Sequence, residues 1–145
     1  LRLTGHSGIY KTSIEMWKEQ PLFGFGLKSF RIKCDEILDR PGDPDRHCAN
    51  HSHNYYIELL SEAGIIGISL MVIFFLILLK DCFDYLKKYN QQKKPEMILL
   101  IPVIILFFLE IWPLKSTGSF FTTWGATFFW LNTAMLIAAK AKKSP

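Results

Sequence analysis

The sequence has 145 residues, of which 50% are hydrophobic and 21% are charged, with a formal net charge of +4. The hydrophobic residues gather in three dense blocks, 65–79, 97–109 and 120–139, whereas an amphipathic helix has polar residues at every third or fourth position. This pattern disfavours an ordinary soluble domain and predicts membrane-spanning helices, with buried helices of a larger soluble protein as the alternative. The surplus lysines flank the blocks, which indicates membrane topology and not nucleic-acid binding.

Residues 1–62 form a polar region with eight Lys/Arg against nine Asp/Glu, a net charge of −1. Its first predicted helix, 8–20, ends at Pro21 and places Tyr10, Ile14 and Trp17 on one face.

A second helix, 27–38, follows the glycines of 24–26. One stripe of this helix carries Leu27, Phe30, Cys34 and Ile37. A third helix is predicted to begin near 51–54 and to run without a break into the first apolar block, with exposed N–H groups at its first turn.

The predicted spans are 63–79, 97–114 and 120–139. The connector 80–96 contains five lysines and the tail 140–145 contains three, so both are predicted to be cytoplasmic. The fold class is therefore an all-α polytopic membrane protein, with three transmembrane helices and a helical region, 1–62, on the outer side. Because the chain begins with leucine and shows no signal peptide, we expect it to be the carboxy-terminal part of a longer chain.

Two of the three cysteines, Cys34 and Cys48, fall in the outer region, where an oxidising compartment permits a disulfide. Cys82 falls in the cytoplasmic connector. A Cys34–Cys48 bridge is thus a candidate, although spacing alone does not show that the two side chains meet.

Three of the four histidines lie close together with a cysteine, in the run His47, Cys48, His51 and His53. One interpretation is that His53 or His51 is a general base, because a helix amino terminus keeps imidazole neutral and attracts phosphate. A second interpretation is a zinc site formed by these four residues. The third is a loop whose histidines only cap a helix and contact water.

Two cations of the second helix, Lys28 and Arg31, are candidates for binding a phosphate if that helix folds against the histidine segment. Together with a neutral histidine, they would form a site for an acceptor hydroxyl and a phosphorylated leaving group.

Several motifs, in this order and spacing, resemble the outer loop of the bacterial O-antigen ligase and polymerase family. They are Gly5-His6, Met16-Trp17-Lys18-Glu19, Pro21-Leu22-Phe23-Gly24-Phe25-Gly26, Phe30-Arg31, Cys48-Ala49-Asn50-His51-Ser52-His53-Asn54, Glu62, Gly64 and Gly67. The segment 113–124 is similar to the one that precedes the last span in some members.

The resemblance implies a multi-pass enzyme of the bacterial cytoplasmic (inner) membrane, with its active site facing the periplasm. Such an enzyme transfers a glycan from undecaprenyl diphosphate to an acceptor hydroxyl, on lipid A-core or another molecule, without a metal or other cofactor. The histidine that precedes asparagine in the family motif is the proposed base, which corresponds to His53, with His51 as the second candidate. Family arginines are thought to hold the donor diphosphate, a role that corresponds to Arg31, with Lys28 beside it.

The sequence departs from the family pattern at His6, where many members have arginine. Either Arg2 or another cation replaces that arginine, or the diphosphate is bound differently. Three other functions remain open at this point. They are a polysaccharide polymerase, a protein O-oligosaccharyltransferase of the same family, and a non-catalytic membrane sensor or transporter subunit that binds zinc.

Overall fold

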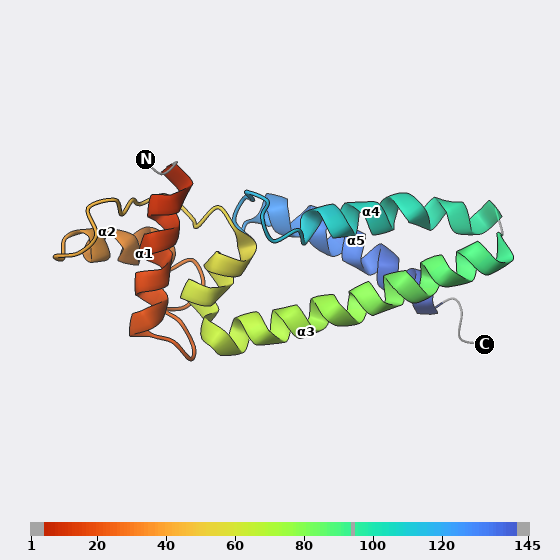
Figure 1. Ribbon diagram of the computed structural model, residues 1–145, viewed down its shortest axis with the longest axis horizontal. Helices are drawn as coiled ribbons and strands as arrows, with labels where there is room; N and C mark the ends of the chain where they lie inside the picture. The colour runs from red at the N-terminus through yellow and green to blue at the C-terminus, as the bar shows by residue number, and fades with distance from the viewer. Residues whose placement is uncertain (1–4, 94, 142–145) are drawn as a thin grey trace. The chain divides into compact units, whose positions relative to one another are not determined.

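The computed structural model describes residues 5–93 and 95–141, which form helices and connecting segments without any strand (Figure 1). The helices are α1 (Gly5–Glu19), α2 (Phe30–Leu38), α3 (Tyr55–Gln92), the 3-10 helix η1 (Pro95–Leu100), α4 (Ile101–Glu110) and α5 (Thr123–Ala141). The prediction of an all-α chain is confirmed. Arg2 and residues 142–145 of the predicted tail lie outside the described residues.

Among the described residues, α3 is the helix whose length and apolar composition suffice to cross a membrane. The apolar helix Ile98–Glu110 is shorter. The predicted second span, 97–114, corresponds to η1 and α4, which end earlier, at Glu110. The predicted third span, 120–139, corresponds to α5, which begins at Thr123 and has 19 residues. One membrane-length helix is therefore established, and the three-span topology stays a prediction.

The chain divides into two compact units. The first contains Leu1–Met71 and Pro113–Gly125, and the second contains Val72–Trp112 and Ala126–Pro145. The first unit thus extends beyond the predicted outer region 1–62, since it takes in the start of the first apolar block and the loop that leads into α5. All the sequence-predicted site residues belong to this first unit.

In the first unit, α1 and α2 pack against each other. Their hydrophobic core consists of Ile9, Met16, Phe30, Cys34 and Ile37. The predicted stripe of α2 is confirmed at its last three positions, whereas Leu27 precedes the helix and is 63% exposed.

The predicted face of α1 with Tyr10, Ile14 and Trp17 is not its most buried face, because Ile14 is exposed while the polar residues Thr12 and Ser13 are buried. The Thr12 hydroxyl donates to the carbonyl oxygen of His47 at 2.9 Å, and the Ser13 hydroxyl lies 2.9 Å from that of Ser52. These hydrogen bonds remove the cost of burying two hydroxyl groups, so the helix turns its polar residues toward the histidine segment.

The predicted unbroken third helix is also wrong. Gly64 has φ 65° and ψ −170°, which interrupts α3 at the start of the apolar block. The loop after α1 enters this break, where the N–H groups of Ile65 and Ile66 donate to the carbonyl oxygens of Pro21 and Leu22 at 2.9 and 3.3 Å. A β-carbon on Gly64 would lie 2.3 Å from the Leu22 oxygen, so both the conformation and the close approach require glycine.

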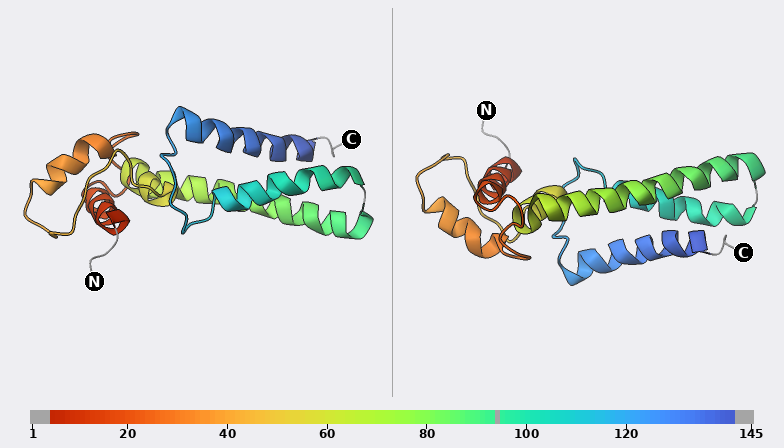
Figure 2. Two further views of the ribbon diagram at one scale, coloured as in Figure 1. Left: turned by 90° about the horizontal axis from the view of Figure 1, so that it is seen from above. Right: turned by 90° about the horizontal axis from the view of Figure 1, so that it is seen from below.

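In the second unit, α4 and α5 lie alongside the later part of α3 (Figures 1 and 2). The buried rings of Phe75, Phe107 and Phe129 meet there, with centroids 5.8 to 6.4 Å apart. Aromatic residues thus hold together the three helices that carry the predicted spans.

Candidate functional site

The site is formed around residues 51–54, which lead into α3, and Asn54 fixes their position. Its side-chain oxygen accepts from the N–H groups of Tyr56 and Ile57 at 3.0 and 3.2 Å, which makes Asn54 the N-cap of α3. Its amide nitrogen donates to the carbonyl oxygens of Pro113 and Lys115 at 2.7 and 3.3 Å. One buried side chain therefore starts the helix and attaches the distant loop 113–117 to it.

This cap changes the expected chemistry of the helix terminus. The sequence predicted exposed N–H groups at the first turn, ready for an anion. Instead, the Asn54 side-chain oxygen accepts hydrogen bonds from two of them. The main-chain carbonyl oxygen of Asn54 accepts from Glu58 N–H at 2.9 Å. The predicted anion site at the start of α3 is therefore wrong, and a phosphate at this site would depend on side chains.

Three histidines meet beside the cap. The His53 ring contacts the His51 ring, with centroids 4.1 Å apart, and the His6 ring at the start of α1, with centroids 4.9 Å apart. His53 has a left-handed φ of 54°, a conformation that residues other than glycine adopt rarely. The backbone is held there by the Thr117 N–H group, which donates to the His53 carbonyl oxygen at 2.9 Å.

Burial of the His53 ring, followed by the nearby His51 and His6, lowers the pKa of His53 below its usual 6.5. The lowered pKa favours the neutral imidazole at pH 7, which is the form that accepts a proton. The His51 Nε2 atom lies 3.3 Å from the carbonyl oxygen of Thr117, and this contact orients the second ring. The geometry thus presents a neutral, half-buried histidine between two further imidazoles.

Two buried acidic side chains lie on α3 before Gly64, and neither was predicted to be a site residue. Glu58 accepts from the Phe120 N–H group at 2.6 Å. Glu62 accepts from the N–H groups of Lys28 and Phe30 at 2.6 and 3.0 Å, at the start of α2. Burial raises the pKa of both carboxyl groups, against the opposing effect of these hydrogen bonds. Each carboxylate joins α3 to a segment distant in sequence.

The predicted cations Arg31 and Lys28 lie at the start of α2, near Glu62, and both are exposed. Glu62 lies seven residues after Tyr55, the first residue of α3, or roughly 10 Å along the helix. The structure therefore brings His51 and His53 together with His6 at the start of α3. The two cations lie near Glu62, further along the same helix.

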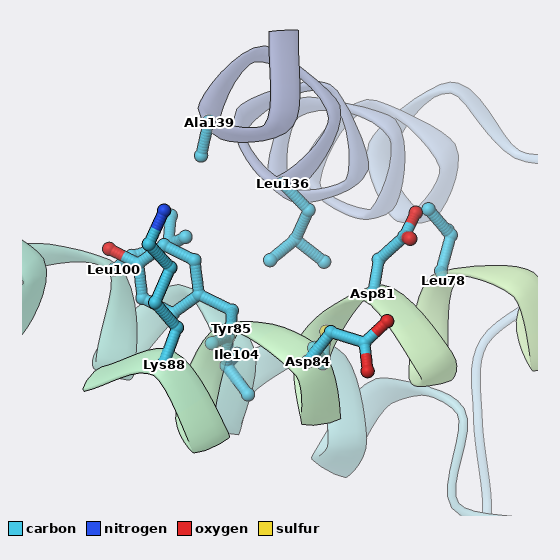
Figure 3. A pocket seen from close by; sticks show the side chains of 10 residues that line it. Leu78, Asp81, Asp84, Tyr85, Lys88, Leu100, Ile104, Leu136 and Ala139 are labelled. Carbon is cyan, nitrogen blue, oxygen red and sulfur yellow. The ribbon is translucent and has the colours of Figure 1, made fainter. Parts of the chain in front are cut away.

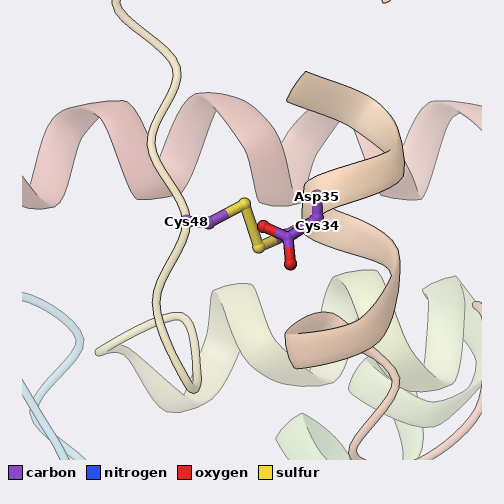
Figure 4. Close-up of side chains that lie close together, drawn as sticks. All are labelled: Cys34, Asp35 and Cys48. Carbon is purple, nitrogen blue, oxygen red and sulfur yellow. A yellow bond between two sulfur atoms is a disulfide. The ribbon is translucent and has the colours of Figure 1, made fainter. Parts of the chain in front are cut away.

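The Cys34 and Cys48 sulfur atoms are bonded, and the two Cα atoms lie 5.6 Å apart (Figure 4). The bridge joins α2 to the segment that carries the histidines. Among the described residues, one group of possible metal ligands lies close together, formed by Cys34, Asp35 and Cys48. The disulfide uses both sulfur atoms of this group. The alternative zinc set of His47, Cys48, His51 and His53 is not gathered into such a group.

A separate pocket lies in the second unit (Figure 3). Apolar residues such as Leu78, Leu100 and Leu136 line it, together with Asp81 and Lys88. None of the sequence-predicted site residues takes part in it, and the chemistry of the site rests on the first unit.

Comparison with known proteins agrees with this location. The O-antigen ligase family matches residues 5–72, a range that contains all three clustered histidines and both buried carboxylates. The exopolysaccharide production protein ExoQ of Rhizobium meliloti (strain 1021) is 28% identical over 112 residues, which cover 74% of this chain and 25% of that protein. The chain thus spans about a quarter of the length of this curated relative. No solved structure matches the chain.

Proposed function

We propose that this chain, whose residues 5–72 match the O-antigen ligase family, is part of a membrane enzyme that transfers a glycan from undecaprenyl diphosphate to an acceptor hydroxyl. The observation that carries the proposal is the contact of His53 with His51 and His6 inside the matched region. The enzyme would be a multi-pass protein of the bacterial inner membrane. Its spans would be 63–79, 97–114 and 120–139, and its active site would face the periplasm.

In the proposed reaction, the neutral His53 ring accepts the proton of the acceptor hydroxyl. The oxygen then attacks the sugar carbon that carries the diphosphate, and the bond from that carbon to the diphosphate oxygen breaks. The lowered pKa of His53 supports this role, since a base must be unprotonated before it can act. His51 is the second candidate base, and its contact with the Thr117 carbonyl oxygen suits it better to orienting His53.

The leaving diphosphate needs hydrogen-bond donors and positive charge, and three side chains are proposed to supply them. His6 occupies the place where many family members have arginine, and a ring N–H of His6 would donate to a phosphate oxygen beside His53. Arg31 and Lys28 would hold the lipid end of the diphosphate at the membrane surface.

The acceptor separates two functions within the family. The name of the Rhizobium relative refers to exopolysaccharide production, which favours a growing polysaccharide chain as the acceptor. A ligase would instead use lipid A-core, and a protein O-oligosaccharyltransferase would use a serine or threonine. The non-catalytic zinc-binding alternative requires a free Cys48 thiolate, and the bridge to Cys34 counts against it.

The decisive experiment measures glycan transfer in the full-length protein with a lipid-linked donor. His53→Ala should abolish transfer while expression and membrane insertion stay normal. His47→Ala is the matched control, because His47 is an exposed histidine of the same segment and should leave transfer unchanged.

Cys48→Ser and Cys34→Ser should weaken transfer equally, through loss of the bridge. If Cys48→Ser is as inactive as His53→Ala, while Cys34→Ser is active and a chelator inhibits the wild type, the metal-free mechanism is wrong.

A further inference from the structure

The loop between α1 and α2, residues 21–27, exposes large apolar side chains. Leu22, Phe23 and Leu27 are 57%, 72% and 63% exposed, although Leu27 was predicted to lie on the buried stripe of α2. Apolar residues thus project together from one short loop of the first unit. A patch of this kind on a protein surface marks an interaction site.

Part of the backbone of the same loop is hydrogen-bonded within the first unit. The N–H groups of Phe25 and Gly26 donate to the carbonyl oxygens of Ser61 and Glu62 at 3.2 and 2.9 Å, and Gly24 N–H donates to Gln20 at 3.0 Å. These pairings add to the two that Pro21 and Leu22 accept at the break in α3. Such internal hydrogen bonds lower the cost of placing the loop in a lipid environment, because the acyl region offers no water to a free N–H or C=O.

The loop also lies at a defined place along α3 (Figure 1). The Leu22 carbonyl oxygen is bonded to Ile66, so the loop is level with the first residues of the proposed span. Ile65 and Ile66 are themselves 43% and 41% exposed, which continues the apolar surface of the loop onto the helix. The side chains of Leu22 and Phe23 therefore reach the depth at which the span enters the bilayer.

We propose that residues 21–27 insert into the outer leaflet of the membrane, with Leu22, Phe23 and Leu27 among the lipid acyl chains. The exposed cations Lys28 and Arg31 follow the loop directly and meet the headgroup phosphates. The inserted loop fixes α1 and α2 at the membrane surface and sets the depth at which these cations meet a phosphate. The proposal rests on the membrane placement of α3 and does not require glycan transfer.

Fluorescence quenching in lipid vesicles tests this insertion. A single cysteine at Phe23 is labelled with an environment-sensitive fluorophore in the full-length protein, after Cys82 and any other free cysteines have been replaced. Leu27→Cys gives a second, independent position. Asp39→Cys is the matched control, because Asp39 is exposed in the same unit at the far end of α2.

Labels at Phe23 and Leu27 should show blue-shifted emission, strong quenching by a lipid that carries a nitroxide on its acyl chain, and weak quenching by aqueous iodide. The label at Asp39 should show the reverse. Iodide quenching at Phe23 as strong as at Asp39 would place the loop in water. Protection of Phe23 from both quenchers would mean that another part of the full-length protein covers it. Either result overturns the insertion, and neither bears on the role of His53.

Discussion

Replacement of Glu58 tests whether a buried carboxylate holds the loop before α5 against the histidine site. Glu58 is 2% exposed and accepts from Phe120 N–H at 2.6 Å. In Glu58→Ala this buried donor loses its partner, at a cost of about 1–3 kcal/mol. The loss of the buried methylene groups adds roughly 1 kcal/mol. We therefore expect Glu58→Ala to destabilise the loop by about 2–4 kcal/mol.

Glu58→Gln separates the hydrogen bond from the charge. The glutamine carbonyl oxygen can still accept from Phe120, so the loss at pH 7 should be less than about 1 kcal/mol. Burial raises the pKa of Glu58 above 4.5, so folding makes protonation of this carboxyl easier than in the unfolded chain. The stability that this shift contributes is fully present below pH 4.5 and is lost as the pH rises through the folded pKa. The stability of Glu58→Gln relative to that of the native protein should therefore be higher at pH 7 than at pH 4.5.

Amide hydrogen exchange of the full-length protein in nanodiscs measures this local stability directly. Exchange at Phe120 and Thr117 should be about 30- to 700-fold faster in Glu58→Ala, since 1.4 kcal/mol corresponds to a factor of ten. Glu36→Ala, at an exposed position, is the control and should leave these amides unchanged. Unchanged exchange in Glu58→Ala, or equal acceleration by alanine and glutamine, would refute this account of the loop.

The remaining predictions concern topology, the break in α3 and the pH dependence of transfer. In spheroplasts, an impermeant thiol reagent should label a cysteine at Asp43 and not one at Gln91, and the reverse pattern would overturn the proposed topology. In a denaturation assay, Gly64→Ala should destabilise the first unit by more than about 1 kcal/mol, because Gly64 has a positive φ and a β-carbon there would block the approach of the loop after α1. Gly118→Ala is the control and should leave the stability unchanged, because open space surrounds Gly118. Because the pKa of His53 in the free protein is lowered, kcat/KM should fall only below pH 6.5. A fall that begins above pH 6.5 would argue against His53 as the base.

Local sequence patterns predicted the positions of the helices more reliably than the contacts that these helices make with distant parts of the chain. The apolar block 65–79 and the breaker Pro21 are local signals, and the corresponding α3 and the end of α1 appear close to where they were expected. The motif of His53 and Asn54 directed attention to the segment in which His51 and His53 meet His6. Asn54 also shows the limit of such signals, because its role as an N-cap removes the free helix terminus that the same motif suggested.

By itself, the sequence determined the all-helical class, the apolar stretch long enough to cross a membrane, and the segment that carries the candidate base. Only the tertiary structure placed His6 against His53, buried Glu58 and Glu62, and inserted the loop after α1 into the break at Gly64. The physical reason is the range of the interactions involved. Helix formation and hydrophobicity depend on neighbouring residues, whereas a buried carboxylate or an interrupted helix needs hydrogen-bond partners from distant parts of the chain, and only the folded protein supplies them.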